Sequence, residues 1–221
     1  MNVLVIAPHR DDEILGVGGT ILKRKAEGNR IAVCIVAARE GEQLGPETLT
    51  AKVRQEMLQA HTLCGIDQYI GLPFAPIILE SYSRKELNKS IFDAIVSVQP
   101  EEVYVPHWGD MQKDHQIVTE SAMVSLRAKY GHPVRRIYAY ETLSETGIHY
   151  PSPDKSFVPN VFVDISAFLE KKKEAMKCYI SQVGDFPDLR SLEAIEALAR
   201  LRGATVNVPA AEAFMLIREI Q

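Results

Sequence analysis

The chain has 221 residues, 46% of them hydrophobic, and a formal net charge of −4. This length and apolar content are enough for one domain with a sizeable core. The acidic balance and a pI near 5.9 leave no basic footprint for nucleic acid. No apolar run reaches the roughly 18 residues that a membrane span needs, and the first residues lack the segments of a secretory signal. We therefore expect a cytoplasmic protein.

Apolar runs with strand character alternate with segments of helical periodicity from the start of the chain. The first unit is a strand at 3–7, a helix at 14–27 ended by Gly28, and a strand at 31–37. The other expected elements are a helix at about 46–63, a strand near 68–71, a helix at about 83–98, a strand at 102–105, a helix from about 114, strands at 136–140 and 160–164, helices at about 166–181 and 189–201, and a terminal segment at 211–219. This alternation predicts an α/β fold, a Rossmann-like and mainly parallel sheet with helices on both faces, as a single domain over residues 1–221.

Charged residues follow two of these strands. "PHRDDE" comes directly after the first strand, and "PHWGDMQKDH" comes after the strand at 102–105. In parallel sheets, ligands bind at the carboxyl ends of the strands. The sequence therefore predicts that the two clusters meet in one crevice.

The two clusters contain the side chains of a metal site. One histidine, an aspartate two or three residues later and a distant histidine offer nitrogen, oxygen and nitrogen ligands, which suit zinc or another borderline divalent ion. Three protein ligands leave a position for water, as in catalytic zinc sites. One of Asp11 and Asp12 can ligate the metal while the other takes a proton from water. Asp114, beside His115, is a candidate for orienting a ligand, since ligating imidazoles usually have a carboxylate or carbonyl partner.

Cysteines and glycines give two further predictions. Cys34, Cys64 and Cys178 lie in separate apolar elements away from both charged clusters, which indicates buried free thiols and argues against a closed thiolate site. Gly16, Gly18 and Gly19 lie near the first strand, as in dinucleotide-binding proteins, but a charged turn occupies the place of the phosphate-binding glycines. Carboxylates repel phosphate, so these glycines indicate close helix packing.

The same motifs resemble those of a known family. "PHRDDEILGVGGT" is similar to the "AHPDDE" signature of the zinc-dependent N-deacetylases called PIG-L or LmbE-like, and "GDMQKDH" is similar to their second motif. "VRQEMLQAHTLCGI", "NVFVDISAFLEKKKEAMKCYISQ" and "RSLEAIEALARLRG" extend the similarity over most of the chain. The resemblance implies that His9, Asp12 and His115 bind zinc and that Asp11 is the general base.

The implied reaction is hydrolysis of an N-acetyl group on an amino sugar or sugar conjugate, which would be a small-molecule or glycoconjugate substrate. Two alternatives stay open: an amidase acting on a thiol-sugar conjugate, and a non-catalytic, metal-bound module that binds sugar. Family members assemble in more than one way, and we expect a homo-oligomer here.

Three positions depart from the family's pattern. Arg10 replaces the proline of the signature, where it either brings a cation to the mouth of the site or points to solvent. Gln112 replaces a histidine; its amide can donate a hydrogen bond to an oxyanion but cannot deliver a proton. We therefore expect Gln112 to contact substrate. Tyr179 replaces another histidine, and we interpret it as a packed helix residue, with a hydroxyl that serves as a donor as the alternative.

Two more residues are candidates for binding substrate. Arg54 matches the family's helix arginine, with Glu56 as a residue that could fix it, although an ordinary surface ion pair is the alternative. Trp108 offers a flat ring for stacking on a sugar, with loop packing as the alternative. We interpret His61 as a lone histidine satisfied at the surface or in a loop.

Overall fold

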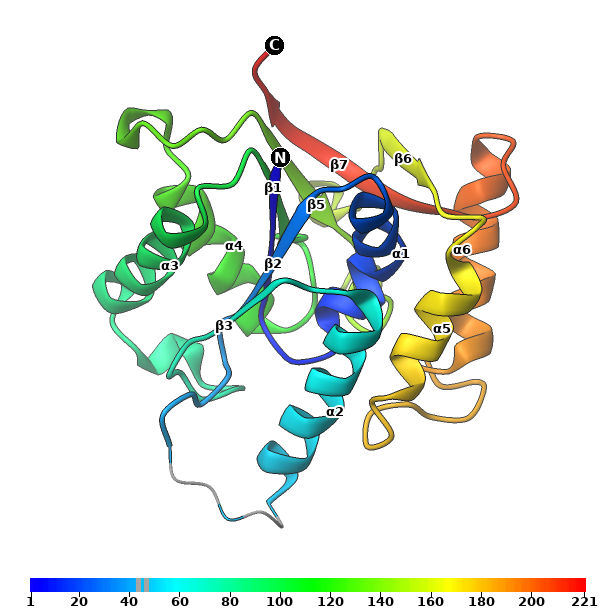
Figure 1. Ribbon diagram of the computed structural model, residues 1–221, viewed down its shortest axis with the longest axis horizontal. Helices are drawn as coiled ribbons and strands as arrows, with labels where there is room; N and C mark the ends of the chain where they lie inside the picture. Colours follow the sequence, from blue (N-terminus) through cyan, green and yellow to red (C-terminus); the bar gives the residue numbers. More distant parts are fainter. Residues whose placement is uncertain (43–44, 46–47) are drawn as a thin grey trace.

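Seven strands form one sheet in the part of the chain that the structure describes, a computed structural model covering residues 1–42, 45 and 48–221 (Figure 1). The strands are β1 (Asn2–Ala7), β2 (Arg30–Ile35), β3 (Gln68–Gly71), β4 (Glu102–Pro106), β5 (Arg136–Tyr140), β6 (Val161–Asp164) and β7 (Ala211–Glu219). Their order is β3-β2-β1-β4-β5-β7-β6. Strands β1 to β5 pair in parallel, whereas β7 is antiparallel to both β5 and β6. The terminal segment of the sequence is thus an interior strand of the sheet.

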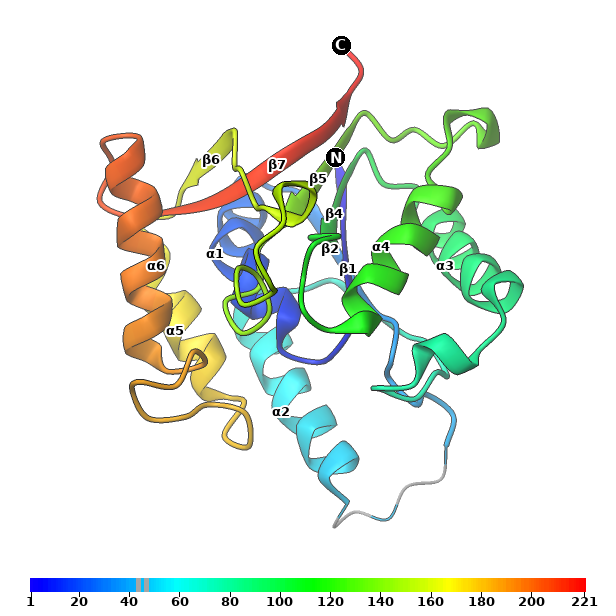
Figure 2. The same ribbon diagram turned by 180° about the vertical axis from the view of Figure 1, so that it is seen from behind.

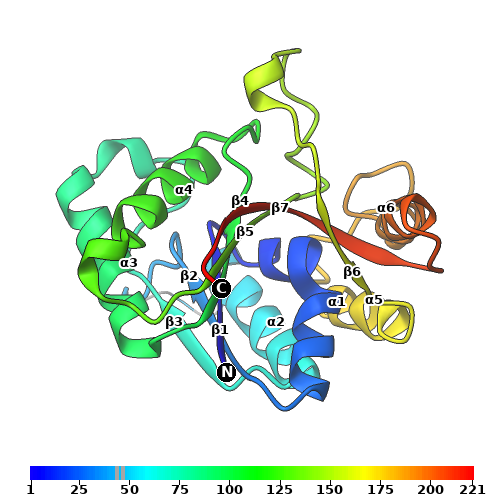
Figure 3. The ribbon, with the colours of Figure 1, turned by 90° about the horizontal axis from the view of Figure 1, so that it is seen from above.

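Helices cover both faces of the sheet, as the view from behind (Figure 2) and the view from above (Figure 3) show. Helices α1 (Asp12–Ala26), α2 (Leu49–Cys64), α5 (Leu169–Lys177) and α6 (Leu192–Thr205) lie on one face. Helices α3 (Arg84–Val98) and α4 (Lys113–Ser125) lie on the other. The three short 3₁₀ segments described are Leu79–Ser81, Ala128–Tyr130 and Pro153–Lys155. The predicted fold class, a mainly parallel α/β sheet in a single domain, is confirmed.

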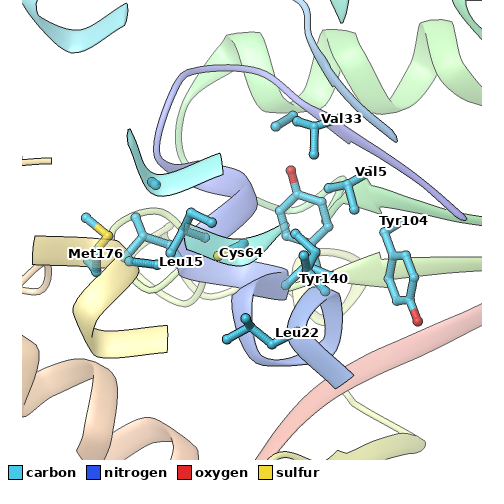
Figure 4. Packing of buried hydrophobic residues seen from close by; sticks show 14 of the residues in the cluster. Val5, Leu15, Leu22, Val33, Cys64, Tyr104, Tyr140 and Met176 are labelled. Atoms are coloured by element: carbon cyan, nitrogen blue, oxygen red, sulfur yellow. The ribbon is translucent and has the colours of Figure 1, made fainter. Parts of the chain in front are cut away.

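The core has two layers, one on each face of the sheet, and β1 contributes to both. Val3 and Val5 pack in the layer under α1, α2, α5 and α6, while Leu4 and Ile6 pack in the layer under α3 and α4. Because both faces are buried, the strand is a continuous apolar run. Figure 4 shows part of the first layer, with Leu15 and Leu22 of α1, Cys64 of α2 and Met176 of α5 near Val5 and Tyr140 of the sheet.

Element boundaries differ from the expectations mainly in the second half of the chain. The expected helix over 166–181 is shorter, because Ser166 turns back to Asp164: its backbone N–H donates to the Asp164 carboxylate at 2.9 Å. The expected helix start at Pro46 lies outside the described residues. The packing role of the glycines is confirmed, since a Cβ on Gly19 would lie 2.7 Å from Ile165.

The cysteine prediction holds in part. All three thiols are free, and Cys34 and Cys64 are buried, but Cys178 is only half-buried. No described helix has both the length and the apolar character needed to cross a membrane.

The sheet order fixes where a ligand can bind. β1 is followed by α1 on one face, whereas its neighbour β4 is followed by α4 on the opposite face. The chain therefore leaves these adjacent strands in opposite directions and opens a crevice at their carboxyl ends, where doubly wound sheets bind ligands. His9 and Asp12 follow β1, and His115 follows β4.

Candidate metal centre and its cleft

The turn between β1 and α1 places Asp11 in an unusual backbone conformation. Its carbonyl accepts the N–H groups of Ile14 and Leu15 at 3.0 and 2.9 Å, as an N-cap residue does, but its side chain makes no capping hydrogen bond. Its φ of 113° lies in the left-handed region, which costs a non-glycine residue about 1–3 kcal/mol. The carboxylate is thereby left free to face the cleft that Asp11 lines.

His9, Asp12 and His115 come together at the sheet edge, each offering one ligand atom within 4.8 Å of the other two. Asp12 Oδ2 lies 3.4 Å from His9 Nδ1 and 3.3 Å from His115 Nε2. Asp12 and His115 are fully buried, whereas 19% of the His9 side chain is exposed. Residues that lie about a hundred positions apart in the sequence thus form one cluster, open to solvent on the His9 side.

Each imidazole of this trio is held by a second carboxylate. His9 Nε2 lies 2.9 Å from Asp114 Oδ2, and His115 Nδ1 lies 2.8 Å from Asp110 Oδ2. Asp114 also accepts the backbone N–H of Ile77 at 2.6 Å. Asp114 therefore contacts the distant histidine, and the partner of its neighbour His115 is Asp110. These contacts leave His9 Nδ1 and His115 Nε2 directed at Asp12.

The trio fits a divalent cation. His115 Nε2 is buried and has no hydrogen-bond partner among the described residues, although it faces the Asp12 carboxylate. Buried polar atoms rarely stay unpaired, so such an atom indicates a site for a further group. Burial lowers the pKa of both imidazoles, but the adjoining carboxylates prevail and raise the pKa of His9 to about 9 and that of His115 to about 10. Positive charge is favoured between these ligands, and the N, O, N set suits zinc or a similar ion.

The two adjacent aspartates have opposite pKa shifts. Burial opposes ionisation of Asp12, but the contacts with His115 and His9 lower the pKa of this carboxyl. Burial and the Asp12 charge instead raise the pKa of Asp11 well above its usual range. Two carboxyl groups whose pKa values are pushed apart are suited to different tasks, one as a fixed anion and the other as a proton acceptor.

A cleft with a volume of about 430 Å³ lies beside the trio. Its wall includes His9, Asp11 and Gln112, together with Glu145 and Arg190 from later parts of the chain. Arg190 Nε lies 3.2 Å from Asp11 Oδ2, and Arg190 Nη2 lies 3.9 Å from Glu145 Oε1. Burial raises the pKa of the Glu145 carboxyl. One guanidinium therefore lies between two carboxyl groups at the wall of the cleft.

The predicted substrate residues lie in different places. Gln112 lines the cleft. Arg54 lines an adjoining pocket together with Arg10, and its guanidinium lies 3.2 Å from Glu40. The indole N–H of Trp108 donates to the Asp154 carbonyl at 3.1 Å, and the Trp108 ring packs on the imidazole of His107. Arg10 also lines the main cleft, so it connects the two pockets.

Two smaller interpretations are wrong. His61 is 5% exposed and lies on α2, where its Nε2 is 3.0 Å from Glu13 Oε1, because this face of the helix packs onto α1. Glu56 does not hold Arg54; it accepts hydrogen bonds from the N–H and the hydroxyl of Ser181, at 3.0 and 2.6 Å. Both partners are far away in the sequence, so local spacing could not indicate them.

The sequence assigns no role to three residues of the site. Asp110 stands in the second charged cluster, five residues before His115, and that position predicts its place at the strand end but not its contact with His115. Arg190 stands in "RSLEAIEALARLRG", a stretch that carries part of the resemblance, and Glu145 follows β5 by five residues. Only the folded chain shows that Arg190 and Glu145 lie at this edge of the sheet.

The fold and this site define a Rossmann-like α/β protein with a candidate metal centre at the carboxyl ends of its central strands. The chain belongs to the PIG-L family, described as GlcNAc-PI de-N-acetylase, whose profile matches residues 4–126.

Relatives and solved structures agree with this membership. The diacetylchitobiose deacetylase of Thermococcus kodakarensis is 28% identical over 200 residues, which are 85% of this chain and 71% of that protein. The conserved protein TT1542 from Thermus thermophilus has a similar structure, with a TM-score of 0.78, 28% identity and coverage of 99% and 96% of the two chains. The N,N'-diacetylchitobiose deacetylase from Pyrococcus horikoshii has a TM-score of 0.76, 25% identity and coverage of 98% and 84%.

Proposed function

We propose that this protein is a zinc-dependent hydrolase that removes the acetyl group from an N-acetylated amino sugar or sugar conjugate. One observation carries the proposal: a His–Asp–His trio lies beside the carboxylate of Asp11 at the wall of a cleft. Membership of the PIG-L family supports it, as does the similarity to two diacetylchitobiose deacetylases.

His9, Asp12 and His115 are the residues that would hold the zinc ion. When bound, zinc supplies a Lewis acid that polarises an amide carbonyl and makes water more acidic. Asp114 and Asp110 fix the ring orientation of the two histidines through their outer nitrogens. Such carboxylate partners set which nitrogen faces a metal and strengthen the ligand.

Asp11 acts as the general base. Its carboxylate takes a proton from the attacking water while the water oxygen forms a bond to the acetamide carbon. The raised pKa of Asp11 suits a proton acceptor that works near neutral pH. The C–N bond then breaks, acetate leaves, and Asp11 passes its proton to the leaving nitrogen. Gln112 serves as a hydrogen-bond donor to the oxyanion, since an amide cannot supply that proton.

The substrate contacts follow from the two adjoining pockets. The cleft of about 430 Å³ takes the sugar ring that carries the acetamide, with Gln112 and Arg190 as polar contacts. The adjoining pocket takes the attached group, with Arg54 as its contact and Arg10 between the two. Trp108 stays a prediction for stacking on the sugar.

The test is acetate release from a panel of N-acetyl sugars, free and conjugated, by the purified protein. We expect release from at least one sugar, loss of release after chelation, and recovery when zinc is added. Turnover of a thiol-sugar amide without acetate release would favour the amidase alternative. Sugar binding without turnover of any amide would favour the binding module and overturn the proposal.

A further inference from the structure

A buried hydrogen-bond network lies directly beneath the proposed base. Glu13, in the first turn of α1, is fully buried, and its Oε2 accepts the backbone N–H of Asp11 at 3.1 Å. Its Oε1 accepts the hydroxyl of Tyr179 and lies 3.0 Å from His61 Nε2. The N–H of Asp11 is therefore tied, through one carboxylate, to residues of α2 and of the segment after α5.

This tie bears on the direction of the Asp11 side chain. Asp11 has a φ of 113°, a conformation that an aspartate keeps only where its surroundings impose it. The direction in which the Cβ leaves the backbone depends on the position of the N–H and carbonyl groups. Since Glu13 holds the N–H, a shift of Glu13 would turn the carboxylate relative to the trio.

Tyr179 is the partner of Glu13 that comes from farthest away, 166 residues along the chain. It is fully buried and follows α5 by two residues. The same segment continues to Arg190, whose Nε contacts the Asp11 carboxylate at 3.2 Å. The segment after α5 thus holds Asp11 in two ways. Tyr179 acts on the Asp11 backbone through Glu13, and Arg190 contacts the Asp11 carboxylate directly.

We propose that Tyr179 is a positioning residue: through Glu13 it holds the backbone of Asp11 in the conformation that directs the base into the cleft. This inference rests on the proposed function, in which Asp11 takes the proton from water. Tyr179 itself does not touch substrate. It acts by keeping the base within the narrow range of positions that proton transfer requires.

The first experiment compares two tyrosine-to-phenylalanine variants. Tyr179→Phe removes the hydroxyl that meets Glu13, and we expect kcat to fall about 10-fold or more, with KM and bound zinc unchanged. Tyr104→Phe is the matched control, because the Tyr104 hydroxyl also donates to a buried carboxylate, that of Glu102 at 2.8 Å, outside the cleft. The control is expected to lose stability but not kcat. Equal kcat losses in the two variants would overturn the inference.

A double variant separates this inference from the proposed function. In an Asp11→Asn background, Tyr179→Phe is expected to cause no further loss of single-turnover acetate release, because its effect passes through Asp11. If the two substitutions instead reduce the rate of acetate release by independent factors that multiply, the positioning role is overturned. Full activity of Asp11→Asn alone would instead reject Asp11 as the base. A normal kcat for Tyr179→Phe beside an impaired Asp11→Asn would reject only the positioning role.

A second pair of variants applies if Tyr179→Phe does not fold. The imidazole of Tyr179→His can donate to Glu13, whereas the side chain of Tyr179→Leu cannot. We expect the histidine variant to keep the higher kcat, at least several-fold above the leucine variant, with similar zinc content. Equal kcat values in this pair would contradict the positioning role.

Discussion

Glu13 and Glu102 are both fully buried, and they lie at opposite ends of the central sheet. Glu102 begins β4 at the amino end of the strand. Its carboxylate accepts hydrogen bonds from three side chains, those of Tyr104, Arg24 and Arg136. Glu13 follows β1 at the carboxyl end, where its partners are Tyr179, His61 and the N–H of Asp11. A buried glutamate thus contacts two arginines at the amino end of the sheet, whereas the other buried glutamate contacts a strained turn at the carboxyl end.

The difference separates a region whose contacts are internal to the fold from the region of the candidate site. At the amino end, the buried charge of Glu102 is balanced by guanidinium groups of the same fold, and the network is complete without any ligand. At the carboxyl end, Asp11 has a left-handed φ, and His115 Nε2 lacks a partner among the described residues. A strained residue beside an unpaired buried nitrogen supports the hypothesis of a binding site at the carboxyl end.

The largest expected effect is loss of His115, a proposed metal ligand. We expect His115→Ala to lose stoichiometric zinc and to release acetate at least about 1000-fold more slowly, because both zinc and the geometry around Asp12 are disturbed. Metal analysis and acetate release measure the two effects. His107→Gln is the control, since His107 is also buried after β4, but its Nε2 lies 3.0 Å from the Lys155 carbonyl. Equal zinc loss in both variants would contradict the assignment of His115.

Replacement of Asp11 is expected to have the next largest effect. Asp11→Asn keeps the shape of the side chain but cannot take a proton, so kcat should fall by about 10²- to 10⁴-fold. Zinc content should stay at the wild-type value, because Asp11 is outside the ligand trio. Acetate release and metal analysis on the same samples test this. A variant with wild-type kcat would contradict the role of Asp11 as the base. A variant without zinc would contradict the assignment of Asp12, and not Asp11, as the metal ligand.

The sequence predicts the fold class and the ligand-binding edge because the patterns that indicate them are local in the chain. The alternation of apolar strands and helices identifies the parallel sheet, and the charge that follows β1 and β4 identifies its ligand-binding edge. The same signals place His9, His115 and the pair Asp11 and Asp12 at this edge, since each stands at a strand end or in a first helical turn. The choice of Asp12 over Asp11 as the ligand came from the family resemblance.

The partners of these residues could not be predicted in the same way. Asp114 and His115 are neighbours in the sequence, but successive helical side chains point about 100° apart, so Asp114 contacts His9. Arg190 reaches Asp11 from 179 positions away, because α5 and the segment after it pack beside α1. Such contacts depend on tertiary packing, for which a single sequence carries no periodic signal.

At the amino end, a change is expected to affect stability and leave activity intact. Glu102→Gln removes the charge that Arg24 Nε meets at 2.8 Å and Arg136 at 3.3 Å. We expect a loss of about 1.5–3 kcal/mol in the free energy of unfolding, the range for hydrogen bonds to a charged group. Chemical denaturation measures the loss, and kcat on the same preparation should match wild type. A fall in kcat would show that the two ends of the sheet are not independent.

The last expected effect is the pH dependence of stabilisation by zinc. The pKa values of His9 and His115 are raised to about 9 and 10, so their charged pairing stabilises the metal-free protein fully below about pH 6.5 and is lost as pH rises through those values. Zinc requires both imidazoles neutral, so protons compete with it. We expect the free energy by which zinc stabilises the folded protein to grow from pH 6 to pH 8, by about 1.4 kcal/mol per pH unit for each proton displaced. The difference in Tm between zinc-loaded and chelated protein should therefore widen over this range. His115→Ala, scanned in parallel, should show no widening. A difference in Tm that is constant over this range in the wild type would mean that zinc does not displace protons from these two rings.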